Sequence, residues 1–327
     1  MKCTNRKRKQ VFLCAILMIF CVLTGCGSLA YDMSYDADIS VSSFNVVSRH
    51  DSRVAEAFAR NLCVITGDYS GSGNVDMDEA KAAVLFSLND SQVLFSKNPH
   101  QEVSPASLTK IMTALVALQN GRLDQVLTAT NAVKITETGA QLLGLKTGDK
   151  MTLDQALRIM LLCSANDVAM LVAEGIGGTV DNFVAMMNEE AKRLGATNTS
   201  FVNPHGLTAD KHYTTAYDLY LIFNEAIKYE TFREIIQMSS YQTTYYDSRG
   251  SEIKVDKRTT NLFLRGDYQA PASVTVIGGK TGTTNAAGHC LILLCRDVGG
   301  ASYISIILGA PSADVLYPKM TELLGEI

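Results

Sequence analysis

The sequence predicts an α/β sandwich with an antiparallel sheet formed by both chain ends and a helical middle. Residues 82–97 hold two β-rich runs on either side of Asn89-Asp90, which is typical of a hairpin. Residues 104–229 show helical periodicity, and the chain then returns to β-rich runs. Strands at both ends that flank a series of helices favour a layered fold in which the two ends share one sheet.

The helical middle divides into segments with recognisable ends. A first helix, SPASLTKIMTALVALQNG, has Pro105 before it and Gly121 at its close. A second segment starts with Thr152 and Gln155 at capping-box spacing, breaks near Ser164 and ends in Gly-Gly. DNFVAMMNEEAKRLG and TTAYDLYLIFNEAIKY complete the middle as two amphipathic helices. The predicted C-terminal elements are the strands SVTVIGG, GHCLILLCRD and ASYISIILGA and a helix near residues 312–325.

Composition and charge narrow the class of protein. The 327 residues are 47% hydrophobic and 19% charged, which excludes collagen-like, disordered and disulfide-dense chains. A net charge of −4 and a pI near 5.8 argue against nucleic acid as a partner. The charge is uneven, because residues 1–9 hold five basic side chains and residues 10–26 hold no charge. Beyond residue 26 the chain keeps 24 of its 29 basic groups against all 33 acidic ones, a net charge of −9.

The first 26 residues have the pattern of an export signal. Thirteen uninterrupted apolar residues follow the basic cluster, whereas about 20 would be needed to span a bilayer. Leu23-Thr24-Gly25-Cys26 resembles a bacterial lipobox, which implies cleavage before Cys26 and a diacylglyceryl group on its sulfur. Two acyl chains hold a soluble domain at a membrane. A plain signal peptide and an uncleaved anchor are the alternatives, and all three interpretations place the domain outside the cytoplasm.

We therefore expect a signal peptide at 1–25, a membrane tether at 26–80 with a short helix at 52–63, and a folded domain at 81–327. Cysteines beyond the signal are interpreted as small buried hydrophobes. Two of them stand five apart in one predicted strand and so point to opposite faces. These cysteines are Cys63, Cys163, Cys290 and Cys295. No Cys or His spacing suggests a metal site.

Ser107-Leu108-Thr109-Lys110 is the first motif with candidate chemistry. At the start of a helix, i, i+3 spacing puts the lysine amine on the same face as the serine hydroxyl. Serine becomes a nucleophile when a base within about 3 Å takes its proton, and a desolvated lysine can serve as that base. The helix N-terminus adds N–H groups where an oxyanion would form. A second S-x-x-K, Ser251 to Lys254, lies in a polar stretch that offers no pocket.

Two further motifs accompany the first. Ser164-Ala165-Asn166 stands at the helix break, where a hydroxyl and a carboxamide can face one cleft. Lys280-Thr281-Gly282 lies between two predicted strands, and its glycine would let a substrate backbone lie along an edge strand. Lys146-Thr147-Gly148 has the same three letters but stands in a turn before a capped helix. Each motif alone is more typical of structure than of catalysis, whereas the three in this order are specific.

Together the motifs resemble the signature of the serine penicillin-recognising enzymes, S-x-x-K, S-D-N and K-T-G, with SAN as the middle motif here. SPASLTKIMTALVAL, SANDVAMLVAEGIGG, FVAMMNEEAKRLGATNTSFVNPHGL, HYTTAYDL and GGKTGTTNAAGHCL are similar to the D-alanyl-D-alanine carboxypeptidases among the low-molecular-mass penicillin-binding proteins. The resemblance implies a β-lactamase/transpeptidase-like catalytic domain at 81–327 and no cofactor. It implies a peptidoglycan stem peptide ending in D-Ala-D-Ala as substrate and β-lactams as inhibitors.

The resemblance also implies residue roles. Ser107 would attack the carbonyl between the two D-alanines and form an acyl-enzyme, with Lys110 as base and Ser164 as proton relay. Asn166 would hold the substrate amide and the Lys110 amine. The other implied substrate contacts are Lys280, Thr281, Gly282 and Thr283, with the N–H groups of Ser107 and Thr283 as the oxyanion hole.

One departure of this sequence from the family concerns the substrate carboxylate. Many relatives supply an arginine before the K-T-G strand to bind the substrate carboxylate. The matching segment here, TTNLFL, holds Thr260 and Asn261, and Arg258 and Arg265 stand only nearby. The residue that would bind the substrate carboxylate is therefore left unassigned.

Alternative functions remain. A β-lactamase would need a fast deacylation device, and no E-x-x-L-N follows Asn166; the loop reads NPHGL instead. A non-catalytic cell-wall-binding lipoprotein would not need three complete motifs. His205 and His212 lie near the two ends of the loop NPHGLTADKHY, but a lysine-based site does not need them, and we expect no catalytic role for either.

Overall fold

The computed structural model of the chain describes residues 62–71 and 75–327. The predicted signal peptide, the predicted lipidation site Cys26 and nearly all of the helix expected at 52–63 lie outside the described residues. The described residues belong to one compact unit. No single helix among them is long and apolar enough to cross a membrane, and the consecutive helices Asn166–Gly177 and Val180–Arg193 reach that length only together, across an 85° bend.

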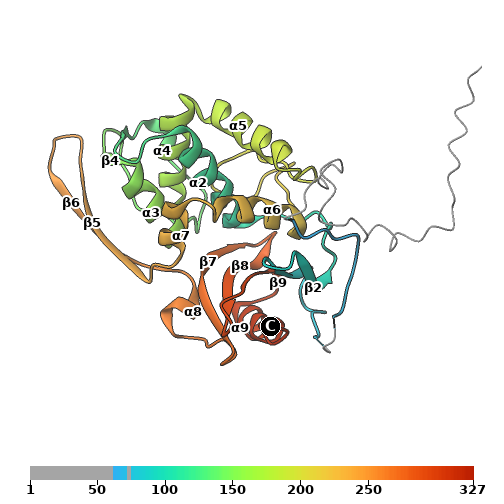
Figure 1. Cartoon of the computed structure of the whole chain (residues 1–327). Coiled ribbons are helices and arrows are strands. Elements are labelled where there is room, and N and C mark those ends of the chain that lie inside the picture. The colour runs from blue at the N-terminus through green and yellow to red at the C-terminus, as the bar shows by residue number, and fades with distance from the viewer. Residues whose placement is uncertain (1–61, 72–74) are drawn as a thin grey trace, which may run out of the picture. The chain divides into compact units, whose positions relative to one another are not determined.

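Both ends of the described chain build the central sheet, as predicted (Figure 1). Its five strands run in the order β2-β1-β9-β8-β7, and every neighbouring pair is antiparallel. The expected hairpin and the three expected C-terminal strands are all present. The strands are β1 (Ala82–Ser87), β2 (Gln92–Lys97), β7 (Val274–Thr284), β8 (Gly288–Asp297) and β9 (Ser302–Ala310).

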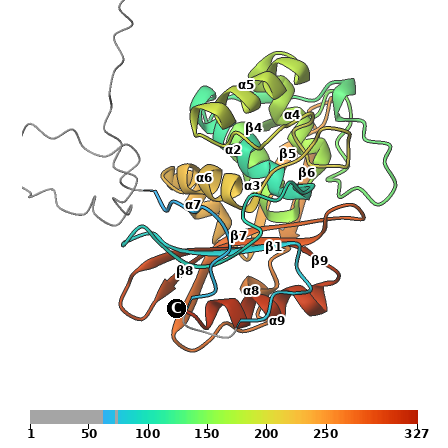
Figure 2. The same cartoon turned by 90° about the vertical axis from the view of Figure 1, so that its right-hand side faces the viewer.

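The central sheet separates two hydrophobic clusters, because side chains along a strand alternate between its faces. Ile292 and Ile304 pack toward the helical middle, whereas Leu291 and Leu293 pack toward the C-terminal helix α9 (Ala313–Leu324). Figure 2 shows α9 and the short helix α8 (Leu262–Arg265) on one face of the sheet and the helices of the chain's middle on the opposite face. Cys290 and Cys295 lie in different clusters, which confirms that they face apart, and all four described cysteines are free.

The predicted helices of the middle are present, whereas the short helices at Asn131–Val133 and Glu230–Ile236 were not predicted. Thr152 caps α3 with the complete capping box to Gln155. Ser164 ends α3 in the left-handed conformation, with φ of 63°, so the break between α3 and α4 falls at the predicted residue. The elements are η2 (Ala106–Leu108), α2 (Thr109–Asn120), η3 (Asn131–Val133), α3 (Leu153–Cys163), α4 (Asn166–Gly177), α5 (Val180–Arg193), α6 (Ala216–Ala226) and α7 (Glu230–Ile236).

A second, four-stranded sheet was not predicted. Its order is β3-β4-β5-β6, and two of its strands have only three residues, too few to show an alternating pattern. The other two form a long hairpin with mostly exposed or half-exposed side chains, so no apolar face marks them in the sequence (Figure 1). These elements are β3 (Val126–Thr128), β4 (Lys150–Thr152), β5 (Ser240–Tyr246) and β6 (Glu252–Arg258), and the short helix α8 (Leu262–Arg265) follows.

The described part of the predicted tether packs against the domain. Cys63 is fully buried in the helical-side cluster, and Met77 is buried in the cluster below α9. Tyr69 pairs with Ser96 at the edge of β2. Residues 62–71 and 75–80 therefore belong to the compact unit, which differs from the expectation that the folded part starts at residue 81. A glycine- and serine-rich composition suggested a linker, while the apolar residues that anchor it are few and scattered.

Candidate active site

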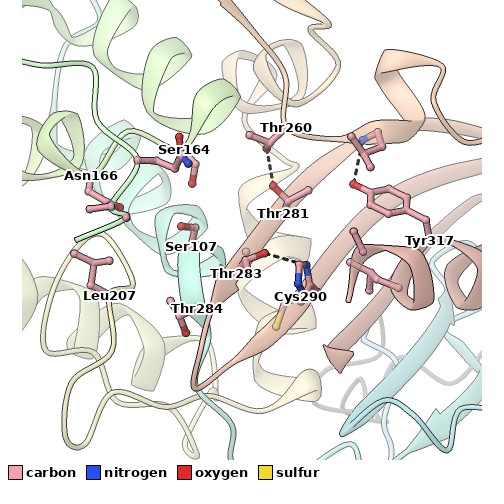
Figure 3. Close-up of a pocket in the computed structure, with 18 residues that line it drawn as sticks. Ser107, Ser164, Asn166, Leu207, Thr260, Thr281, Thr283, Thr284, Cys290 and Tyr317 are labelled. Carbon is pink, nitrogen blue, oxygen red and sulfur yellow. Dashed lines mark hydrogen bonds between the residues drawn. The ribbon is translucent and has the colours of Figure 1, made fainter. Parts of the chain in front are cut away.

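The three predicted motifs meet at one cleft of about 400 Å³ between the helical middle and the edge strand β7 (Figure 3). The predicted residues in its lining are Ser107, Ser164, Asn166, Thr281, Gly282 and Thr283. Lys110 and Lys280 lie beneath this surface, with 0% and 1% of their area exposed. The structure thus brings together every predicted site residue except Cys26, which lies outside the described residues.

Close backbone approaches hold the turn that carries Ser107. Ala106 precedes it with a φ of 47°, an uncommon conformation for a residue with a side chain. A Cβ on Gly206 would lie 1.8 Å from the Ala106 carbonyl oxygen, so only glycine fits there. A Cβ on Gly282 would lie 3.0 Å from the Ser107 nitrogen. Glycine at this point of the K-T-G motif therefore lets strand β7 lie directly against the Ser107 N–H.

Lys110 is buried among oxygen atoms. Its Nζ lies 2.6 Å from Asn166 Oδ1, 2.6 Å from the His205 carbonyl oxygen and 3.2 Å from Ser107 Oγ. Burial and the charge of Lys280 lower the pKa of Lys110 well below its usual value. A neutral amine has two hydrogens and one lone pair. Since the Asn166 and His205 oxygens can only accept, the lone pair is left for the Ser107 hydroxyl.

Lys280 occupies the opposite wall of the cleft. Its Nζ donates to Ser164 Oγ at 3.1 Å and to the Thr281 carbonyl oxygen at 2.7 Å. Burial lowers the pKa of Lys280 to about 7. Ser164 thereby points into the cleft, held by this contact and by its left-handed backbone.

Thr260 lies at the α8 side of the cleft, in the segment where many relatives supply an arginine and this sequence has none. Its hydroxyl lies 2.5 Å from the Thr281 hydroxyl, and both side chains line the cleft. The Thr260 N–H donates to the Leu162 carbonyl oxygen at 3.2 Å, which ties this segment to the end of α3. Arg258 is exposed on β6 and Arg265 forms an ion pair with Asp267, so neither arginine lines the cleft.

Asp167, which directly follows the SAN motif, fastens one wall of the cleft. Its buried carboxylate accepts the N–H groups of Leu143 and Gly144 at 2.9 and 2.7 Å, and those of two further residues at 3.0 Å. The Asn166 N–H donates to the Gln141 carbonyl oxygen at 2.8 Å. The loop at 139–145 is thus attached to the same helix start that positions Asn166. This role of Asp167 was not predicted, although Asp167 directly follows the SAN motif in the sequence.

The two histidines of the loop NPHGLTADKHY, His205 and His212, support the site without facing the substrate space. His212 Nδ1 accepts the Val202 N–H at 3.0 Å, so its Nε2 carries the hydrogen and donates to the Thr109 hydroxyl at 2.9 Å. Burial lowers the pKa of His212 to about 4 and that of His205 to about 3, with the charge of Lys110 contributing at His205. His205 contributes its backbone carbonyl to Lys110, a contact that no sequence motif reveals.

The two sequence decoys are separated from the site. Lys146-Thr147-Gly148 forms a turn in which Lys146 N–H donates to Asp149, and none of the three lines the cleft. Ser251 and Lys254 lie on the exposed β5–β6 hairpin, where extended backbone points an i, i+3 pair to opposite faces. In the part of the chain that the structure describes, no three His, Cys, Asp or Glu side chains gather as metal ligands.

The fold and the arrangement of the three motifs define the class of serine penicillin-recognising enzymes. Within it, the chain belongs to the D-alanyl-D-alanine carboxypeptidase family, whose sequence profile matches residues 72–312. It is 34% identical over 254 residues to the D-alanyl-D-alanine carboxypeptidase DacF of Bacillus subtilis, covering 75% of this chain and 61% of that one. It is 33% identical over 246 residues to DacB2 of Mycobacterium tuberculosis, covering 74% and 80%.

Solved structures agree with the family. The Streptomyces K15 DD-transpeptidase superposes with a TM-score of 0.71 at 28% identity, covering 78% of this chain and 98% of that one. A D-alanyl-D-alanine carboxypeptidase from Mycobacterium tuberculosis gives 0.69 at 28% identity, covering 79% and 95%. The chain spans about three-fifths of the length of DacF and of the Escherichia coli relative DacC.

Replacing Asp167 by Asn tests the attachment of the cleft wall. An amide keeps one acceptor oxygen and turns an NH₂ group toward N–H donors, which costs about 1–3 kcal/mol for each buried N–H left unpaired. We expect a lower free energy of unfolding in urea and a rate of acylation by penicillin reduced about ten- to a hundredfold.

Asp218→Asn is the matched control. Asp218 is equally buried and accepts the Asn198 N–H at 2.8 Å and the Thr199 hydroxyl at 2.7 Å, but it does not line the cleft. It should lose stability and keep the acylation rate. Equal acylation rates in the two folded variants would show that Asp167 matters for stability alone.

Proposed function

We propose that the chain is a serine-type D-Ala-D-Ala carboxypeptidase that removes the terminal D-alanine of peptidoglycan stem peptides through an acyl-enzyme. One observation carries the proposal. The solvent-free amine of Lys110 lies 3.2 Å from Ser107 Oγ, with oxygen acceptors for its own hydrogens. Family membership and the structural relatives support the same chemistry.

Acylation starts with transfer of the Ser107 hydroxyl proton to the Lys110 lone pair. Ser107 Oγ then bonds to the carbonyl carbon between the two D-alanines, and the negative charge moves to the carbonyl oxygen. The N–H groups of Ser107 and Thr283 stabilise this oxyanion. Ser164 passes a proton to the departing nitrogen, its own proton being replaced from Lys110, so the C–N bond breaks and D-alanine leaves.

Deacylation uses the same groups, with water in place of the Ser107 hydroxyl as the nucleophile. Lys110, neutral again, takes a proton from water, the hydroxide attacks the ester carbon, and the Ser107–carbonyl bond breaks. Ser107 recovers its proton and the shortened peptide leaves. A β-lactam acylates Ser107 by the same first step, but its leaving nitrogen stays tethered to the acyl group through the ring. The tethered group remains in the cleft, which makes such compounds inhibitors.

The substrate is oriented by the other residues of the cleft. Asn166 donates an amide N–H to the peptide, while its Oδ1 accepts a hydrogen bond from the Lys110 amine. Thr281 and Thr260 present a pair of hydroxyl groups to the terminal carboxylate, and Lys280 adds positive charge behind them. A hydroxyl pair with one buried amine thus takes the place that an arginine has in many relatives.

We further propose that the protein acts at the outer face of the cell membrane, held there by lipid on Cys26. The lipobox-like Leu23-Thr24-Gly25-Cys26 supports this, with residues 1–25 as the signal and the segment that follows as the tether. Mass spectrometry of the mature protein tests this proposal: Cys26 should be the first residue and should carry the mass of a diacylglyceryl group. A chain that keeps residues 1–25 would favour an uncleaved anchor.

Ser107→Ala tests the proposed nucleophile. Without the hydroxyl no ester forms, so D-alanine release from a D-Ala-D-Ala peptide should fall at least about 10⁴-fold and labelling by fluorescent penicillin should disappear. Ser251→Ala removes the serine of the decoy motif on the exposed hairpin and should leave both unchanged. Residual labelling of Ser107→Ala, or loss of labelling in Ser251→Ala, would contradict the assignment.

Lys280→Met tests the coupling of the two buried amines. Neutral Lys110 is the base, so acylation should rise with pH through the pKa of Lys110. The charge of Lys280 lowers the pKa of Lys110. Met removes this charge but keeps the site buried, so the pKa of Lys110 should rise. We expect the acylation rate by penicillin to reach half its maximum at a higher pH in Lys280→Met. The exposed Lys254→Met should keep the wild-type midpoint, and an unchanged or lower midpoint in Lys280→Met would refute the coupling.

A further inference from the structure

The outer side of β6 is a long strand edge that has no neighbouring strand in the part of the chain that the structure describes. Figure 1 shows the β5–β6 hairpin extending away from the helices, and β6 is the last strand of its sheet. The other long edge strands are engaged, because β7 lines the catalytic cleft and Tyr69 pairs with Ser96 of β2. β6 has seven residues, no proline and an unbroken register with β5, so its backbone is able to pair with another strand.

The hydrogen bonds at the two ends of the hairpin show which backbone groups of β6 point outward. Before the strand, the Asp247 N–H donates to the Ser251 carbonyl oxygen at 2.9 Å. After the strand, the Thr259 N–H donates to the Ser239 carbonyl oxygen, also at 2.9 Å. Hydrogen-bonded and non-hydrogen-bonded pairs alternate along an antiparallel ladder, so the odd-numbered residues of β6 bond to β5. The N–H and C=O groups of the even-numbered residues therefore point to the free edge, and these residues are Glu252, Lys254, Asp256 and Arg258.

The even-numbered residues of β6 alternate in charge, and β5 offers them no opposite charge. Their side chains are all exposed, whereas Val255 on the other face of the strand is buried. Asp256 accepts a hydrogen bond from Gln242 Nε2 at 2.9 Å, and among the described residues none of the four charged side chains forms an ion pair. Complementary charge can reach them from a strand added at the free edge. The residues opposite them on β5 are neutral, namely Tyr246, Thr244, Gln242 and Ser240.

The order of charges along β6 is complementary to itself when the strand is reversed. Two copies that pair antiparallel about Val255 place Glu252 opposite Arg258, and two-fold symmetry repeats the pair. The same register places Lys254 opposite Asp256, and all these pairs join even-numbered residues, so each can also exchange two backbone hydrogen bonds. An axis at Lys254 would instead place Glu252 opposite Asp256, and an axis at Asp256 would place Lys254 opposite Arg258. Like charges directly opposite each other are destabilising, so the charges favour one register and oppose its neighbours.

We propose that the chain forms a two-fold symmetric dimer in which the β6 strands of two copies pair antiparallel about Val255 and join the two four-stranded sheets. The partner is a second copy of the chain, because the free edge carries both signs of charge in a self-complementary order. A single pair of edge strands is a small interface beside the roughly 1,200–2,000 Å² of a stable complex, so the dimer is weak and its affinity falls with salt. No residue of β6 lines the catalytic cleft, and the inference does not rest on the proposed activity.

Charge reversal at two positions tests the dimer and its register. The dissociation constant is measured by sedimentation of the purified full-length chain in a mild detergent, at low and at high salt. Lys254→Glu places two carboxylates opposite each other and Asp256→Lys places two amines opposite each other, so each variant alone should dimerise at least about tenfold more weakly than the wild-type chain at low salt. An equimolar mixture of the two variants should recover the wild-type dissociation constant within about threefold, because the mixed pair again has opposite charges at both positions.

General repulsion between acidic chains predicts a different result. Asp256→Lys makes the chain less acidic, so general repulsion alone would strengthen its dimer, whereas the proposed register weakens it. Lys192→Glu is the matched control for Lys254→Glu, since Lys192 is exposed on α5 and its reversal changes the net charge equally. It should dimerise as the wild-type chain does. Labelling by fluorescent penicillin, which should be the same in all variants, shows that each is folded.

Three results would overturn the proposal. The first is a wild-type chain that stays monomeric at every concentration, and the second is a single reversal on β6 that dimerises as the wild-type chain does. The third is a mixture of Lys254→Glu and Asp256→Lys that associates as weakly as its components. Each of these results would leave the proposed carboxypeptidase activity untouched, because that activity is measured by D-alanine release.

Discussion

The structure depends on one buried amine, the Nζ of Lys110. Holding an ammonium away from water costs several kcal/mol unless a charge compensates it, and among the described residues no carboxylate lies within ion-pair distance of this lysine. The neutral amine is therefore lower in free energy than the ammonium at this site, and it is also the form that can take a proton. The geometry around it follows from this. Two neutral oxygens accept its hydrogens, and a hydroxyl faces its lone pair.

The surrounding fold supplies those oxygens from segments far apart in the chain. Asn166 starts α4 because the backbone reverses at Ser164, and the His205 carbonyl comes from a loop that can approach only because Gly206 has no side chain. Strand β7 closes the site for the same reason at Gly282. The second buried amine, Lys280, orients Ser164 and lowers the pKa of Lys110 through its charge. The cleft thus forms where these segments pack closely around Ser107 and Lys110, at the start of α2.

Much of this arrangement could be predicted from the sequence, and the limits are physical. The capping box of Thr152 and the alternation of side chains along β8 could be predicted because each is a local sequence pattern that is compatible with only one local structure. The three motifs gave seven residues, and the family resemblance added Thr283; the structure gathers all eight at one cleft. Backbone contributions were not readable, since the His205 carbonyl has no side-chain signature. The three-residue strands β3 and β4 are also too short to show a period.

Other features needed the third dimension. The burial of Cys63 was expected, but its place in the core of the domain, ahead of the expected domain start at residue 81, was not. The Thr260–Thr281 hydroxyl pair became visible as a replacement for an arginine only when both side chains were seen to line the cleft. The role of Asp167 required the loop at 139–145 to be placed in space.

The most direct test of the account is the protonation state of Lys110 itself. The pH dependence of its Nζ chemical shift can be followed by ¹⁵N NMR in protein labelled at lysine, with the signal assigned by its loss in Lys110→Met. We expect Lys110 to titrate well below the usual lysine pKa of about 10.4 and to be neutral when the protein acylates. An ammonium that persists up to the usual lysine pKa would contradict it, because Ser107 would then have no base.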